Sequence, residues 1–321
     1  MTSHDLIKGP ARSSCLPSVE LLAAIPEEDL WLQGQLSPHT RRAYKEDVLH
    51  FMRCLNITNR DELRQVTRGA VIAWVRAMEP DGAKPRTVRR RLSALSSLFN
   101  HLIEHHLTTS NPVGTIKRPK TNRRTGVTKA FSAEQARAIL DAPAGDTVAD
   151  LRDRAMLSVL LQAGPRRAEV ANMRVKDFHQ DGGYWSLQYT KKGDQEHSLS
   201  LNPQTVIRIQ RYLETGGHGT DADGPLFRAT KKSWRNADEN RFLSADLVDR
   251  IVRKYIKKAL DIDRGFSAHS CRATFATNAL EKACPLEDVQ EALGHADSRT
   301  TKLYDKRGHK PERSAAFFAN Y

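Results

Sequence analysis

The sequence predicts a mainly α-helical protein with a small β-sheet (α+β), divided into two domains. Most apolar residues recur at helical spacings of three, four and seven, and only one stretch alternates as a β-hairpin does. The chain has 321 residues, enough for two cores, and a basic stretch without hydrophobic periodicity interrupts it near residue 120. We therefore expect one helical domain before that stretch and an α+β domain after it.

The first domain is expected to be a small helical bundle. Apolar stripes predict helices over 37–55, 66–78 and 84–106, with Thr40 as a possible N-cap of the first and Asn111-Pro112 ending the third. In the second helix the apolar stripe is expected to comprise Val71, Ile72, Val75 and Met78.

The third helix opens with a cluster of positive charge, which comprises Lys84, Arg86, Arg89, Arg90 and Arg91. Cations at a helix N-terminus oppose the helix dipole, so the cluster favours an external anion such as phosphate. A solvated surface is the alternative.

Residues 114–129 hold six basic residues and no acidic ones, which indicates a linker lying along a phosphate backbone. The expected organisation is a flexible leader over 1–29, the helical domain over 30–113, the linker over 114–130 and a second domain over 131–321, which ends in a tail over 305–321.

The second domain begins with Ser132 and Gln135, which fit a capping box. A buried helix is then expected to end at Gly164, and residues 183–201 to form a hairpin. Helices are expected from Pro203, over 244–260, and at about 268–283 and 285–293.

The formal net charge is +13, which favours a polyanionic partner, nucleic acid first. The four cysteines have no CxxC spacing and no paired histidine ligands, so neither a zinc site nor a disulfide framework is expected. No apolar run is long enough to span a bilayer, and the N-terminus lacks a signal-peptide pattern. We expect a cytoplasmic, nucleoid-associated protein.

Four separated patches of the second domain carry candidate chemistry. They are AGPRRAEV from Ala163, KKGDQEH from Lys191, HSCR from His269 and LGHADSRTTKLY from Leu293. Each patch alone is more often a surface feature or a packing contact. In this order, however, they resemble the tyrosine recombinase or phage integrase (lambda-integrase-like) family. HSCRATFAT and the nine-residue gap from His295 to Tyr304 are strong matches.

The resemblance implies a SAM-like core-binding domain followed by a tyrosine recombinase catalytic domain. It implies that the catalytic residues are Arg166, Lys192, His269, Arg272, His295 and the nucleophile Tyr304. Glu169 falls at a commonly acidic position that would orient an arginine. The sequence departs from the family pattern at Pro165, at Arg167, which adds a second arginine, and at Ala273.

Phosphotyrosyl transfer explains these residue types. A covalent link conserves the energy of the broken phosphodiester, arginines stabilise charge at the five-coordinate phosphorus, and cationic neighbours would favour the tyrosine phenolate. Lys192 is the candidate proton donor to the leaving 5′ oxygen, with His269 assisting. We expect no cofactor and no metal, because no carboxylate cluster suited to Mg²⁺ accompanies the set.

The expected function is site-specific recombination through a 3′-phosphotyrosyl link, for integration, excision or resolution of a mobile element or chromosome dimer. A type IB topoisomerase and an inactive DNA-binding regulator are the alternatives. The expected partners are double-stranded DNA and a synaptic tetramer coupled through the C-terminal tail; a second recombinase or accessory protein is left open. The candidate DNA-binding residues are Thr40, Arg41, Lys84, Arg86, Arg89, Arg90, Arg91, Lys117, Arg118, Lys120, Arg123 and Arg124.

Overall fold

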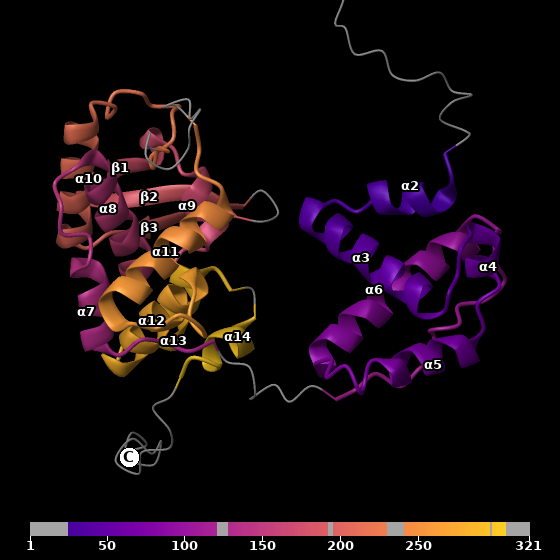
Figure 1. Cartoon of the computed structure of the whole chain (residues 1–321). Coiled ribbons are helices and arrows are strands. Elements are labelled where there is room, and N and C mark those ends of the chain that lie inside the picture. Colours follow the sequence, from indigo (N-terminus) through magenta and orange to yellow (C-terminus); the bar gives the residue numbers. More distant parts are fainter. Residues whose placement is uncertain (1–24, 121–127, 192–194, 230–240, 296, 306–321) are drawn as a thin grey trace, which may run out of the picture. The chain divides into compact units, whose positions relative to one another are not determined.

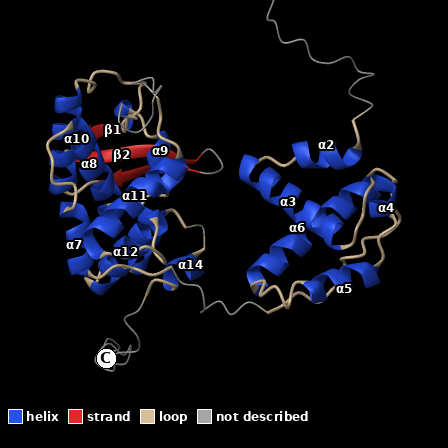
Figure 2. Cartoon of the chain, in the orientation of Figure 1, coloured by secondary structure: helices blue, strands red, loops and turns tan. Residues whose placement is uncertain are grey.

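The computed structural model describes residues 25–120, 128–191, 195–229, 241–295 and 297–305. The chain divides into two compact units, one within Met1–Arg123 and one within Arg124–Tyr321 (Figure 1). Most described residues are helical, and the strands all belong to the second unit (Figure 2). No helix of these described ranges is long and apolar enough to cross a membrane.

The helices of the first unit pack around tryptophan and phenylalanine side chains. Trp74 is fully buried, contacts Phe51 edge-on at 4.9 Å, and donates a hydrogen bond from Nε1 to Nδ1 of His50 at 3.0 Å. The helices are α2 (Glu27–Gln33), α3 (Pro38–Cys54), α4 (Arg60–Arg64), α5 (Arg68–Ala77) and α6 (Pro85–Glu104).

Two details of the first unit differ from the expectation. Ser37, not Thr40, is the N-cap residue of α3, because Pro38 occupies the first helical position. In α5 the side chain of Ile72 is exposed and Trp74 is buried instead. Trp74 lies three residues after Val71 and four before Met78, so it completes the buried stripe, whereas Ile72 lies at the edge of that stripe.

In the second unit, helices surround an antiparallel sheet of order β1-β2-β3. Helix α8 is buried on nearly all sides, and the expected capping box of Ser132 and Gln135 is present. The elements are α7 (Ala133–Asp141), α8 (Val148–Gln162), α9 (Arg167–Asn172), η1 (Val175–Asp177), β1 (Phe178–Asp181), β2 (Tyr184–Lys191), β3 (Gln195–Ser200), α10 (Pro203–Gly216), α11 (Ala245–Leu260), α12 (Ala268–Glu281), α13 (Leu286–Leu293) and α14 (Ser298–Lys302).

The hairpin is confirmed by the register of β2 and β3, in which Tyr189 lies opposite His197. Strand β1 was not predicted, because only Phe178 of its four residues has a strong preference for strands. The hairpin also contacts the helices beyond it, since the His197 ring lies 3.0 Å, through Nε2, from the carbonyl of Ala292 at the end of α13. This contact joins the sheet to the segment that leads into His295.

Candidate active site

Arg272 lies at the centre of the candidate site, as the fifth residue of α12. Its side chain is 1% exposed. Nη1 donates to the carbonyl of Gly164 at 2.7 Å, and Nη2 donates to the carbonyl of Leu293 at 2.6 Å. One guanidinium group therefore joins the turn before α9, the helix α12 and the end of α13.

Arg166 is held by a different arrangement. It is the N-cap residue of α9, and its Nη1 donates to Oε1 of Glu169 at 2.7 Å, while Oε2 accepts the Arg166 backbone N–H at 2.6 Å. The nearly buried Glu169 thus fixes both the backbone and the side chain of Arg166. Arg167 points elsewhere, to Asp246 on α11 at 3.2 Å. The geometry distinguishes the two arginines that the sequence placed side by side.

Gly164 allows the close approach of the turn to α12. Its φ is +69°, and a Cβ on it would lie 2.6 Å from Cδ1 of Phe275. A side chain would therefore force apart the turn and α12, on which Arg272 lies.

His295 connects Arg272 to the tyrosine. Its Nε2 lies 2.9 Å from Nη2 of Arg272, and its Nδ1 lies 2.9 Å from Oγ1 of Thr301. Because arginine can only donate, Nε2 must accept, which assigns the proton to Nδ1 and leaves the ring neutral. Thr301 is fully buried and was not predicted from the sequence; its position three residues before Tyr304 was the available signal.

Tyr304 is 7% exposed and its ring stacks on that of His295, with centroids 6.2 Å apart. Burial raises the pKa of the Tyr304 hydroxyl, while Arg272 and Arg166 act in the lowering direction. The expectation that the arginines favour the phenolate is therefore confirmed in direction, but burial outweighs them and the net pKa of Tyr304 is raised. The hydroxyl is therefore protonated at neutral pH, and any reaction at this oxygen would need a group that accepts its proton.

His269 lies one turn before Arg272, with an exposed ring. Loss of hydration near the surrounding protein lowers its pKa, and Arg272 and Arg166 lower it further. A neutral imidazole is therefore favoured at neutral pH, which is the form that accepts a proton.

Tyr189 on β2 is a further residue of the site that was not among the candidates predicted from the sequence. It lines a cavity of about 900 Å³ together with Arg166 and Glu169. Its hydroxyl is buried and has no hydrogen-bond partner among the described residues. Burial is the main cause of its raised pKa, and Glu169 adds to it. Lys192 lies outside the described residues.

The basic candidates of the first unit fall into two groups. Arg90 and Arg91 pair with the buried Asp47 on α3, and Arg118 donates to Oγ of Ser93 at 2.7 Å. Burial raises the pKa of Asp47 against the lowering effect of Arg90 and Arg91. Five other candidates are exposed: Lys84, Arg86, Arg89, Lys117 and Lys120. Thr40 and Arg41 are half-buried, and Arg123 and Arg124 lie outside the described residues.

Comparison with known proteins matches both units. Residues 129–309, more than half of the chain, match the phage integrase family, and residues 27–106 match its N-terminal SAM-like domain. Tyrosine recombinase XerC of Pelobacter propionicus is 31% identical over 85% of this chain and 86% of its own length. Tyrosine recombinase XerD of Listeria monocytogenes is 28% identical over 86% of this chain and 90% of its own length.

Solved structures share the fold at lower identity. A XerH site-specific recombinase in a post-cleavage complex with a palindromic difH substrate has a TM-score of 0.67 at 19% identity, covering 94% of this chain and 87% of that chain. A lambda integrase tetramer bound to a Holliday junction has a TM-score of 0.65 at 19% identity, covering 88% of this chain and 76% of that chain.

Proposed function

The chain belongs to the phage integrase family of tyrosine recombinases, which cleave and rejoin DNA through a covalent tyrosine intermediate, and on that premise we propose that Tyr304 is its nucleophile. The observation that carries the proposal is the connected series from the buried Arg272 through His295 to the Tyr304 ring. The protein is accordingly a site-specific DNA recombinase.

The proposed step forms a bond from the Tyr304 oxygen to the scissile phosphorus and breaks the bond to the 5′ oxygen. The product is a 3′-phosphotyrosyl link and a free 5′ hydroxyl. His269 accepts the phenol proton, because its lowered pKa keeps the ring neutral. Lys192 gives a proton to the departing oxygen. Reversal of the same step with a second strand rejoins the DNA.

The two arginines stabilise the charge that develops on the non-bridging oxygens. Arg166 offers a half-exposed guanidinium that Glu169 holds in place. Arg272 offers the N–H groups that are not already bonded to the two carbonyls or to His295. A preorganised donor of this kind typically contributes on the order of 10²–10³ in rate. His295, already hydrogen-bonded to Arg272 and Thr301, acts as a third phosphate ligand when a phosphate oxygen replaces Nη2 of Arg272 at Nε2, which requires that Nε2 take up a proton.

A nicked suicide substrate tests the nucleophile, since loss of the short 5′ fragment traps the covalent adduct. We expect the adduct with the full chain and none with Tyr304→Phe. Tyr184→Phe is the matched control, because Tyr184 is 70% exposed on β2. An adduct that persists in Tyr304→Phe, or one whose linked peptide lacks residue 304, would reject the assignment.

Strand exchange between two labelled duplexes separates recombination from DNA relaxation alone. Exchange with covalent trapping supports integration, excision or resolution by this chain, whereas relaxation without exchange would support a topoisomerase. Band shifts with no adduct at all would support a binding regulator.

We further propose that the exposed basic residues of the first unit bind the phosphate backbone of double-stranded DNA. Lys84, Arg86 and Lys117 have no internal pairing among the described residues, in contrast to Arg90. Replacing one of them by alanine should weaken binding about equally for all sequences and reduce the salt dependence by roughly one charge. An unchanged salt slope would remove that residue from the interface.

Self-association on DNA is the last part of the proposal, supported by the lambda integrase tetramer on a Holliday junction. The tail from residue 306 onward lies outside the described residues, and we propose that it couples neighbouring subunits. Truncation after Gly308 should then weaken cooperative DNA binding without affecting a single half-site. Equal cooperativity in both proteins would reject this role.

A further inference from the structure

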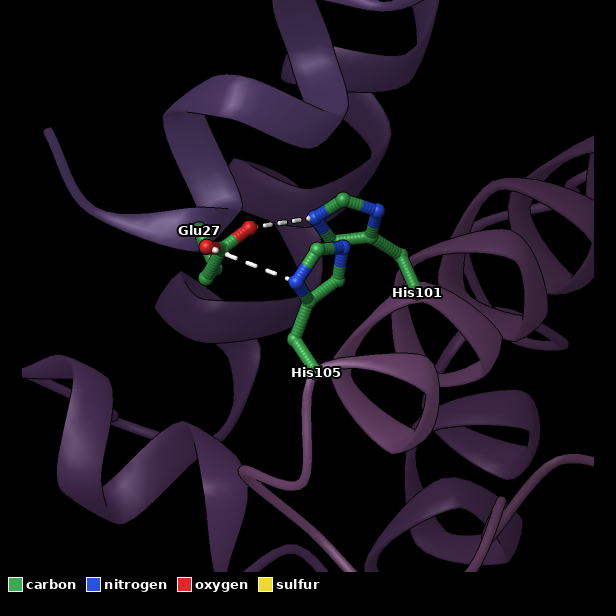
Figure 3. A group of neighbouring side chains, drawn as sticks. All are labelled: Glu27, His101 and His105. Carbon is green, nitrogen blue, oxygen red and sulfur yellow. Dashed lines mark hydrogen bonds and ion pairs between the residues drawn. The ribbon is translucent and has the colours of Figure 1, made fainter. Parts of the chain in front are cut away.

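Three side chains with metal-binding chemistry converge in the first unit (Figure 3). Glu27 is the first residue of α2, His101 lies in the last turn of α6, and His105 is the C-cap residue of the same helix. The spacing of four residues puts both imidazoles on one face of α6, turned toward the carboxylate of Glu27. We propose that these three residues bind one divalent transition-metal ion of the zinc class.

The distances suit such an ion. Nε2 of His101 lies 2.9 Å from Oε2 of Glu27, and Nδ1 of His105 lies 3.6 Å from Oε1. One ligand atom from each residue lies within 4.8 Å of the other two. An ion with tetrahedral bonds of about 2.0–2.1 Å holds its ligand atoms roughly 3.3 Å apart. Small side-chain rotations therefore suffice to close the site around an ion.

A bound ion would also balance the charges of the two imidazoles and the carboxylate better than these groups do among themselves. The centroids of the His101 and His105 rings are only 4.4 Å apart, and the two rings share a single carboxylate. If both rings were protonated, their charges would repel at that distance. One dication lets both imidazoles stay neutral and neutralises the carboxylate in addition. The C-terminal end of α6, where His101 and His105 lie, also favours positive charge.

The ligand set defines the class of ion. Two imidazole nitrogens and one carboxylate oxygen suit zinc, cobalt and nickel, whereas magnesium and calcium prefer oxygen ligands alone. The fourth position remains for solvent, which can reach it because His105 is 46% exposed. A cavity of about 440 Å³ is lined partly by Asn100, His101 and Glu104, so it reaches one of the three ligands.

The site lies in the SAM-like unit and contains none of the proposed catalytic residues. An ion there ties Glu27 at the start of α2 to His101, 74 residues later in α6. The two helices already meet through a hydrogen bond from Trp31 Nε1 to Ser97 Oγ at 3.1 Å. The expectation of no metal rested on cysteine spacing, on the lack of paired histidine ligands beside the cysteines and on the absence of a carboxylate cluster. It did not consider two histidines four residues apart that a distant glutamate completes.

Titration of the full-length protein with Co²⁺ tests the proposal, by calorimetry and by visible absorption, since four-coordinate Co²⁺ absorbs strongly. We expect one ion per chain at this site and a Tm that rises with added ion. His101→Gln and Glu27→Gln should each weaken binding at least tenfold and abolish the absorption and the Tm increase. His106→Asn is the matched control; it removes the adjacent imidazole, and asparagine tolerates the φ of +57° at that position. Mg²⁺ should give no signal.

Absence of the Co²⁺ absorption in the unaltered protein would overturn the proposal. So would an affinity unchanged in both ligand variants, because the ion would then be bound elsewhere, or equal weakening in His106→Asn. Circular dichroism establishes that each variant is folded. If either ligand variant fails that check, His105→Gln replaces it under the same tenfold criterion, because His105 is the most exposed of the three ligands.

Discussion

The two arginines proposed to bind the scissile phosphate differ in almost every physical respect. Arg166 at the start of α9 is 44% exposed and paired with one carboxylate. Arg272 in α12 is 1% exposed and bonded to two backbone carbonyls and one imidazole. Both lie in the same site, yet only Arg272 also holds distant segments of the chain together. The difference predicts that stability and catalysis are separable at Arg166 and inseparable at Arg272.

The largest effect is expected for Arg272→Ala. The substitution removes the donors to the carbonyls of Gly164 and Leu293, and each buried acceptor left unpaired costs about 1–3 kcal/mol. We expect the free energy of unfolding to fall by about 2–5 kcal/mol and DNA cleavage to be undetectable. Urea unfolding and the suicide-substrate assay measure the two effects. A variant of normal stability would contradict the structural role.

Arg166→Ala should separate the two properties. We expect cleavage to fall by on the order of 10²–10³, because a transition-state donor is lost. Stability should fall by only about 1 kcal/mol, since Glu169 keeps its bond to the backbone of residue 166.

Arg167→Ala is the matched control for this experiment, because Arg167 is equally exposed but pairs with Asp246. Single-turnover cleavage and thermal unfolding of both variants make the comparison. A large loss of cleavage in Arg167→Ala, with normal cleavage in Arg166→Ala, would reverse the assignment of the arginines.

The two arginines also affect how stability depends on pH, through His269. Burial lowers the pKa of His269, and Arg272 and Arg166 lower it further. Its pKa is lowered in the folded chain, so the unfolded chain binds the proton more tightly, and stability is lost as pH falls from about 6.5 toward the folded value. We expect the free energy of unfolding to decrease by up to about 1.4 kcal/mol per pH unit below 6.5 for this group. His50 and His218, whose pKa values burial also lowers, add to the same trend.

NMR titration of His269 in the unaltered protein and in Arg166→Ala isolates the contribution of one arginine. The imidazole should titrate below its ordinary range in the former and higher in the latter. Identical titration in both proteins would show that Arg166 lies too far away to act on it.

Tyr189→Phe should have the smallest effect on stability, and it should raise stability where the other substitutions lower it. Its hydroxyl is buried beside both arginines without a described partner, so removing it relieves a desolvation cost. We expect stability to rise by up to about 1 kcal/mol, in contrast to the well-partnered Arg272. Chemical denaturation measures the change, and a clear loss of stability would mean that the hydroxyl has a partner.

The sequence predicted those parts of the fold that depend on local periodicity. The buried face of α6 and the capping box of α7 followed from spacing. Strand β1 and the burial of Trp74 did not, because each depends on what packs against it. The site shows the same limit. The order of the motifs was enough to select Arg166, His269, Arg272, His295 and Tyr304, but not to predict the contacts that hold them. No pattern reveals that Leu293 and Gly164 offer carbonyls to Arg272, since those contacts join residues that are far apart in sequence.

The bonds from Arg272 to Gly164 and Leu293 also bear on the order of events during folding. They span 108 and 21 residues, and contacts of long sequence separation form only after the entropy of closing the intervening chain has been overcome. Partly folded chains that already contain α8 or α11 still lack the Arg272 position that the proposed cleavage uses. We therefore expect a newly synthesised chain to gain the ability to break DNA only when the whole second unit has folded.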